Sequence, residues 1–123
     1  MKRPPPRISV VIPARNEAAM IASTVGSVLR ARDRYRETRH DGAAVEVIVV
    51  DNASDDGTAD ALARHTAEGG VLMATCTPRG AARARNLGAR LASGRALVFL
   101  DADTRLPPGA LVRIAEQIGR AHV

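Results

Sequence analysis

The chain has 123 residues, enough for one domain, and 46% of them are hydrophobic, so a packed core is possible. Its formal net charge is +5, and its single cysteine, Cys76, excludes an internal disulfide. With one Phe, one Tyr and no Trp, the core must be built from Val, Ile, Leu and Ala, which suits closely packed strands and helices.

The amino-terminal segment, residues 1–7, is basic and Pro-rich, and no apolar run long enough for a signal peptide or a membrane span follows it. We therefore expect a cytoplasmic protein without a transmembrane segment.

The arginines at positions 30, 32, 34, 36 and 39 are predicted to form a solvated connector, because Tyr35 is the only aromatic residue among them. We expect no nucleic-acid partner, and peripheral membrane contact stays open.

Apolar runs and helical spacing alternate along the chain. Strands are predicted over residues 8–12, 45–50, 71–75 and 96–100, with Pro13 ending the first. Helices are predicted from residue 16 into the Arg-rich stretch, from the capping residues Asp55, Asp56 and Thr58 to about residue 66, from residue 80 to near 94, and after Pro107 and Pro108. A turn is expected at Asp41 and Gly42.

Strands that alternate with helices predict a Rossmann-like α/β fold. It would have a parallel sheet of about four strands with helices on both faces. Ligands of such sheets bind beyond the carboxyl ends of the strands. Polar clusters follow three of the four predicted strands, at residues 13–17, 51–58 and 101–103, and would therefore share one edge of the sheet.

Two carboxylates, Asp101 and Asp103, directly follow the most apolar predicted strand. Such a pair suits Mg²⁺ or Mn²⁺, which prefer oxygen ligands and keep positions open for phosphate oxygens. The residues alone allow equally that Asp103 caps the following turn. Glycine-loop nucleotide folds are disfavoured, because the turn after residue 12 has no glycine and the only lysine is Lys2.

Four segments, in order and with matching spacing, resemble the signatures of family 2 glycosyltransferases: residues 8–17 (ISVVIPARNE), 47–58 (VIVVDNASDDGT), 80–88 (GAARARNLG) and 98–103 (VFLDAD). The resemblance spans residues 8 to about 111. It implies a GT-A fold and a nucleoside-diphosphate-sugar donor, UDP-sugar as the first expectation, bound with Mn²⁺ or Mg²⁺.

The resemblance also implies the donor-site residues. These are Pro13, Ala14, Arg15, Glu17, Asp51, Arg85, Asp101, Ala102 and Asp103. In that family the first Asp of the Asp-x-Asp signature lies near the ribose and sugar, and the last binds the metal. Asp103 and Asp101 are therefore the expected metal ligands, and Asp55, Asp56 and Thr58 are expected to shape their loop and start its helix.

Family members continue beyond the length of this chain, so we expect residues 1–123 to be a single donor-binding domain, truncated before the acceptor half. The general base and the acceptor are therefore not identified, and no catalytic residue is nominated. The leading hypothesis is a glycosyltransferase donor domain; a non-catalytic nucleotide-sugar-binding module is the alternative, followed by a nucleotidyltransferase. An exposed apolar face where the later half would dock could also favour a homo-oligomer.

Overall fold

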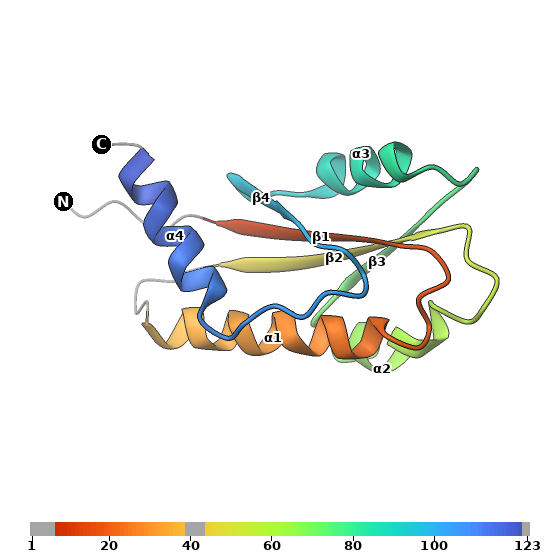
Figure 1. Ribbon diagram of the computed structural model, residues 1–123, viewed down its shortest axis with the longest axis horizontal. Coiled ribbons are helices and arrows are strands. Elements are labelled where there is room, and N and C mark those ends of the chain that lie inside the picture. The colour runs from red at the N-terminus through yellow and green to blue at the C-terminus, as the bar shows by residue number, and fades with distance from the viewer. Residues whose placement is uncertain (1–6, 39–43, 122–123) are drawn as a thin grey trace.

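The fold, taken from a computed structural model that describes residues 7–38 and 44–121, is built on a four-stranded parallel sheet (Figure 1). The strands are β1 (Ile8–Ala14), β2 (Val45–Asn52), β3 (Leu72–Cys76) and β4 (Ala96–Phe99). They are arranged in the order β3-β2-β1-β4, and every neighbouring pair is parallel. The predicted α/β fold with a parallel sheet is confirmed.

Helices cover both faces of the sheet. They are α1 (Ile21–Thr38), α2 (Ala63–Ala67), preceded by the short 3-10 helix η1 (Asp60–Leu62), α3 (Ala81–Leu91) and α4 (Ala110–Ala121). Figure 1 shows α3 on one face and α1 and α2 on the other, with α4 packed beside α1. Helix α1 packs against β2, whereas α3 packs mainly over the two central strands, β2 and β1.

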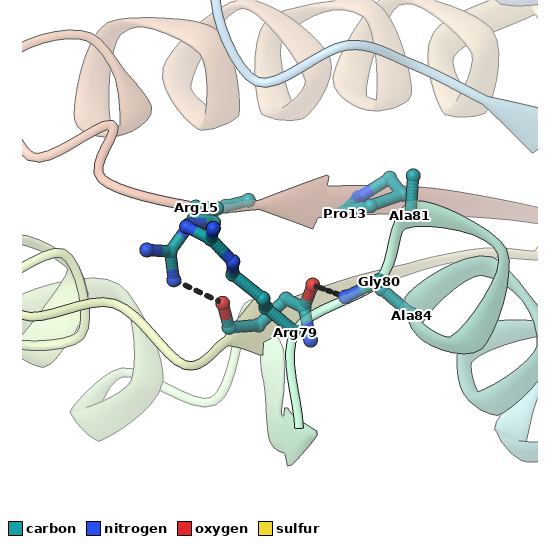
Figure 2. A pocket seen from close by; sticks show the side chains of 8 residues that line it. Pro13, Arg15, Arg79, Gly80, Ala81 and Ala84 are labelled. Atoms are coloured by element: carbon teal, nitrogen blue, oxygen red, sulfur yellow. Dashed lines mark hydrogen bonds between the residues drawn. The ribbon is translucent and has the colours of Figure 1, made fainter. Parts of the chain in front are cut away.

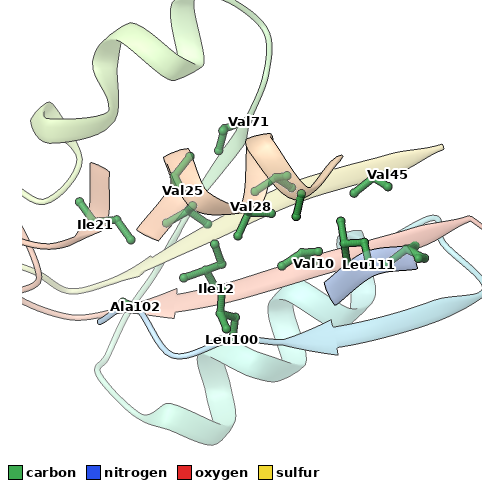
Figure 3. Packing of buried hydrophobic residues seen from close by; sticks show 14 of the residues in the cluster. Val10, Ile12, Ile21, Val25, Val28, Val45, Val71, Leu100, Ala102 and Leu111 are labelled. Carbon is green, nitrogen blue, oxygen red and sulfur yellow. The ribbon is translucent and has the colours of Figure 1, made fainter. Parts of the chain in front are cut away.

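The alternation of side chains along β1 and β2 divides the core between the two faces. The larger cluster lies under α1 and includes Val10, Ile12, Val25 and Leu111 (Figure 3). The smaller one lies under α3 and contains Val11, Ile48, Val50, Cys76 and Ala84. Both central strands are therefore buried on both faces, as their continuous apolar runs predict.

Pro13 does not end the first strand, contrary to the prediction, because β1 continues to Ala14. The carbonyl of Val11 accepts a hydrogen bond from the N–H of Leu100, on the β4 side of β1. The nitrogen of Pro13, two residues later, faces the same side, beyond the end of β4 at Phe99. No sheet partner is present there, so a residue without an N–H is tolerated.

The Arg-rich stretch is not a connector, contrary to the prediction, because α1 continues through it to Thr38. Arginine is a good helix former, and the stretch also has a buried side. Val28, Ala31 and Tyr35, spaced three and four residues apart, are all fully buried. Of the predicted features, the turn at Asp41 and Gly42, Arg39 and the segment before Arg7 lie outside the described residues.

The second helical segment starts later than predicted, with η1 at Asp60, and no side chain in the described part of the chain caps η1 or α2. Asp56 and Thr58 are engaged instead by the loop after β1. Strand β3 is shifted by one residue from the predicted range and ends at Cys76. The first and last residues of short elements at the edge of a fold depend on contacts with neighbouring elements, and local sequence propensity does not include these contacts.

Strand β4 lies at the edge of the sheet, and its face on the α3 side is not covered. Leu97 and Phe99 are 42% and 46% exposed, and Leu91 at the end of α3 is 42% exposed. Helix α3 packs over β1 and β2 instead, so helices cover both faces of the sheet as predicted but leave this edge strand open on one side. Homo-oligomer formation stays a prediction.

Glu46 joins β1, β2 and the segment before β4 at the amino edge of the sheet. Its Oε1 accepts hydrogen bonds from the Ser9 hydroxyl and from the backbone N–H and hydroxyl of Ser93. The Ser9 hydroxyl in turn accepts the N–H of Gly94 at 2.8 Å. Partial burial raises the pKa of Glu46, but the hydrogen bonds from Ser9 and Ser93 outweigh it, so the pKa lies below its ordinary value.

We expect Glu46→Gln to lower the free energy of unfolding at pH 7 by about 1 kcal/mol, because hydrogen bonds to a charged acceptor are stronger than those to a neutral one. A pKa lowered by folding adds stability above the unfolded-state pKa, and this stability is lost as the pH falls through the folded-state pKa. Urea unfolding at a series of pH values should therefore show the deficit of the variant shrinking below about pH 4.5. Glu37→Gln, on the exposed end of α1, is the control; an equal effect from it would contradict the assignment.

Candidate functional site

The three polar clusters that follow β1, β2 and β4 lie at one edge of the sheet, as the sequence predicts. Ala14 of β1 is in register with Asp51 of β2, and Val11 of β1 is in register with Phe99 of β4. Since all three strands are parallel, the loops that leave them emerge on the same side. The order of the sheet places the loop after β1 between the other two.

The loops after β1 and β2 are joined by a reciprocal pair of hydrogen bonds. The N–H of Asn16 donates to the Ser54 hydroxyl at 3.0 Å, and the N–H of Asp55 donates to Asn16 Oδ1 at 2.9 Å. Asn16 and Ala53 both have a positive φ, which is costly for a residue with a side chain. The contacts between the loops maintain this conformation, which local propensity alone would not favour.

Asp56 and Thr58 hold the start of the chain that leads into α1. The N–H of Glu17 donates to the Thr58 hydroxyl at 3.0 Å, and the N–H of Ala18 donates to Asp56 Oδ2 at 3.1 Å. The hydrogen bond from the Thr58 hydroxyl is the main reason that the pKa of Asp56 lies below its ordinary value. These two residues therefore shape the loop, as expected, but they do not cap the helix that follows them.

Arg15 is anchored over the end of β2. One guanidinium nitrogen, Nη1, donates to the carbonyl of Ala53 at 2.6 Å and lies 3.4 Å from that of Asn52. Backbone carbonyls satisfy its donors without neutralising its charge. The positive charge of Arg15 is thus fixed at the carboxyl edge of the sheet.

Asp51 and Asn52 are consecutive in β2, so their side chains leave opposite faces of the sheet. Asp51 is 9% exposed, and its Oδ1 is buried without a hydrogen-bond partner among residues 7–38 and 44–121. An unpaired buried carboxylate oxygen is unfavourable unless a ligand supplies a donor. Asp51 is therefore available to accept a hydrogen bond at this edge.

Asn52, on the α3 side, fixes the loop between β3 and α3. Its Nδ2 donates to the carbonyls of Cys76 and Pro78 at 3.0 and 3.3 Å, and its Oδ1 accepts the N–H of Gly80 at 2.7 Å. This loop closes a pocket of about 430 Å³. Its lining, shown in Figure 2, consists of Pro13, Ala14, Arg15, Asn52, Arg79, Gly80, Ala81 and Ala84.

The loop after β4 is fastened to α1 through the residue between the two carboxylates. Ala102 is 6% exposed, and its carbonyl accepts the hydroxyl of Thr24 at 2.7 Å. Further along, the N–H of Leu106 donates to the Ser27 hydroxyl at 2.9 Å. Because Ala102 is anchored in the core, Asp101 and Asp103 on either side of it are held in an exposed position.

The expected donor-site residues separate into two groups. Pro13, Ala14 and Arg15 line the pocket. The others lie outside this lining: Glu17, Asp51, Asp101, Ala102 and Asp103 belong to the strand ends and loops at the same edge, and Arg85 is exposed on α3. The roles that the family resemblance gives these residues stay predictions.

Sequence reasoning missed Asn52 and Arg79 as residues of this site. Asn52 adjoins Asp51, and the alternation of side chains in a strand was the available signal that it faces the other side of the sheet. Arg79 stands between Pro78 and Gly80, in a segment whose pattern indicates only the start of a helix. No signal in the sequence places that segment beside Arg15, because the pairing of β2 with β3 decides it.

Comparisons with known proteins agree with this architecture. The sequence model of the family described as Glycosyl transferase family 2 matches residues 9–123. The succinoglycan biosynthesis protein ExoO of Rhizobium meliloti (strain 1021) is 33% identical over 116 residues, which cover 94% of this chain and 31% of that protein.

Two solved glycosyltransferase structures are similar in fold and sequence. The mannosyltransferase PcManGT from Pyrobaculum calidifontis, in complex with GDP-Man and Mn²⁺, has a TM-score of 0.70 and 34% identity over 87% of this chain and 30% of its own. The glucosyl-3-phosphoglycerate synthase from Mycobacterium tuberculosis, in complex with Mn²⁺, UDP and glucosyl-3-phosphoglycerate, has a TM-score of 0.60 and 31% identity over 84% of this chain and 36% of its own. These neighbours bear out the expected GT-A arrangement of the sheet.

The chain spans about a third of the length of these relatives. None of the helices in residues 7–38 and 44–121 has the length and hydropathy needed to cross a bilayer.

Proposed function

Because the chain belongs to glycosyl transferase family 2, we propose that it binds a nucleoside-diphosphate sugar as a complex with a divalent cation, for transfer of the sugar to an acceptor hydroxyl. The observation that carries this proposal is the meeting of three polar strand ends at one edge of a parallel sheet. Open α/β sheets bind their ligands at this edge. A pocket of about 430 Å³ beside it is large enough for part of a nucleotide.

The cation is proposed to bind at Asp103, with Asp101 beside it. Both carboxylates are exposed and belong to the residues on either side of the anchored Ala102. No group of three or more potential metal ligands occurs among the described residues. Two carboxylate ligands suit Mg²⁺ or Mn²⁺, because these ions retain water and take further oxygen ligands from a substrate diphosphate. The complexes of both neighbouring structures contain Mn²⁺.

In the proposed mechanism an acceptor hydroxyl attacks the anomeric carbon of the donor, and the bond from that carbon to the diphosphate oxygen breaks. The proton of the hydroxyl passes to a general base, a role that we assign to no residue of this chain. The divalent cation supplies charge stabilisation for the departing nucleoside diphosphate. Asp103, with Asp101 beside it, would hold this cation. Asp51 accepts a hydrogen bond from the nucleoside through its Oδ1, which has no partner among the described residues, and Pro13, Ala14 and Arg15 line the pocket at the same edge of the sheet.

We assign only donor binding to residues 1–123, because the chain spans about a third of its relatives. The two metal-containing neighbours carry different nucleotides, GDP-Man and UDP. Uracil and guanine each have a ring N–H that can donate a hydrogen bond to the Asp51 carboxylate. UDP is the first donor to be tested and GDP the second.

Calorimetric titration of this chain with UDP, GDP and their sugars, with and without Mn²⁺, tests the proposal. We expect binding in Mn²⁺ to be at least about tenfold tighter than in EDTA, because a cation held by Asp103 and Asp101 would offset the negative charge of the diphosphate. Affinity equal in the two conditions would contradict the metal-bound donor. Donor hydrolysis or sugar transfer by this chain would in addition argue against a role in binding alone.

A further inference from the structure

The pocket between β1, β2 and α3 contains two arginines and no acidic residue (Figure 2). Arg15 approaches it from the loop after β1, and Arg79 approaches it from the loop before α3. The remaining lining is Asn52 and small or apolar residues. Both walls therefore carry positive charge, and nothing in the lining offsets it.

Arg15 keeps its charge although its donors are partly satisfied. The carbonyls that it contacts, those of Ala53 and Asn52, are neutral. Arg79 is exposed and forms no ion pair within residues 7–38 and 44–121. Two like charges that face one concave space repel each other, and an anion between them would remove this repulsion.

The side chains of the two arginines differ in conformational freedom, which indicates a different role for each. Arg15 is fixed by hydrogen bonds before a ligand arrives, so it loses little side-chain entropy on binding. Arg79 follows Pro78, and its loop backbone is held by Asn52 through Pro78 and Gly80. Its base is therefore fixed, while its guanidinium is free to approach a ligand. A planar guanidinium donates two parallel hydrogen bonds to phosphate oxygens.

We propose that Arg79, together with Arg15, forms a phosphate-binding subsite in this pocket that operates without a metal ion. The proposal rests on the proposed function in placing a phosphorylated ligand at this edge of the sheet. It adds a second phosphate contact, separate from the cation at Asp103. The phosphate is carried either by the donor nucleotide or by the acceptor.

Calorimetric titration in EDTA isolates this subsite, because it removes the contribution of the cation. The probes are uridine, uridine 5′-monophosphate and glycerol phosphate. We expect the nucleotide to bind about tenfold more tightly than the nucleoside, and Arg79→Gln to abolish this difference. Arg90→Gln, an exposed arginine at the far end of α3, is the matched control and should change nothing.

The two phosphate sources give different results. If the nucleotide loses affinity in Arg79→Gln, the subsite serves the donor; if only glycerol phosphate binds and requires Arg79, it serves the acceptor. An unchanged affinity of Arg79→Gln for every phosphate probe would overturn the proposal. If donor binding in Mn²⁺ stays intact in that variant, the proposed function survives while this inference fails. If the parent chain shows no Mn²⁺-dependent binding but binds phosphate in EDTA, the proposed function fails while this inference survives.

Discussion

Asp103→Ala should weaken the binding of a nucleoside diphosphate in the presence of Mn²⁺ by roughly 100-fold, or about 2.7 kcal/mol. The substitution removes one of the two carboxylates on either side of the anchored Ala102, and a hard cation depends on such oxygen ligands. Because Ala102 and not Asp103 makes the contact with α1, the loop should keep its position. Calorimetric titration with UDP or GDP in Mn²⁺ measures the effect.

Two comparisons separate a metal site from a general charge effect. In EDTA, Asp103→Ala and the parent should bind nucleotide with equal affinity, since the carboxylate acts only through the cation. Asp33→Ala removes an exposed carboxylate from α1 and should leave the Mn²⁺-dependent affinity unchanged. Parent-like binding by Asp103→Ala in Mn²⁺ would favour the other interpretation of the sequence, in which Asp103 only caps a turn.

Gly88→Ala should lower the free energy of unfolding by about 3 kcal/mol, which is at the upper end of the cost of overpacking a core. A Cβ at this position of α3 would lie 2.2 Å from Val11 Cγ1 and 3.3 Å from Val50 Cγ2. Val11 is fully buried in the central strand, and its β-branched side chain has little freedom to rotate away. Helix α3 would therefore have to move off the sheet. Urea unfolding of the purified variant measures the loss.

Gly26→Ala provides the matched control within α1. A Cβ there would meet only the flexible end of Arg30, at 3.5 Å, so this substitution should stabilise the chain by about 0.5–1 kcal/mol. In a Val11→Ala background, Gly88→Ala should be much less costly, because the clashing methyl groups are gone. An equal cost in both backgrounds would contradict the close contact between α3 and β1. Gly88 belongs to the third family signature, and its role here is packing.

The structure confirms the predicted fold because the sequence patterns that indicate it are local. The apolar runs in β1 and β2 are continuous and short, and this pattern is typical of strands buried on both faces. The alternation of such runs with amphipathic segments then permits few arrangements. The predicted ends of elements were wrong where a contact with another element decides them. Strand β1 extends past Pro13 because β4 ends early, and α1 continues because the side chain of Tyr35 is buried in the core.

The site was predictable in part. Parallel strands guarantee that residues 13–17, 51–58 and 101–103 share an edge, so their convergence followed from the order of elements. The hydrogen bonds that support them were not predictable, because they join residues far apart in the chain. Thr24 and Ala102 are separated by 78 positions, and Asn52 and Gly80 by 28.

The amino-acid sequence by itself determined the family, the layered parallel sheet and the edge at which a ligand would bind, since period and spacing are properties of the chain. Only the tertiary structure decided that Asp51 and Asn52 serve opposite faces of the sheet and that Arg79 faces the same pocket as Arg15. It also decided that β4 keeps an uncovered apolar face. The physical reason is that side-chain contacts depend on strand order and helix placement, which the packing of the whole core selects together.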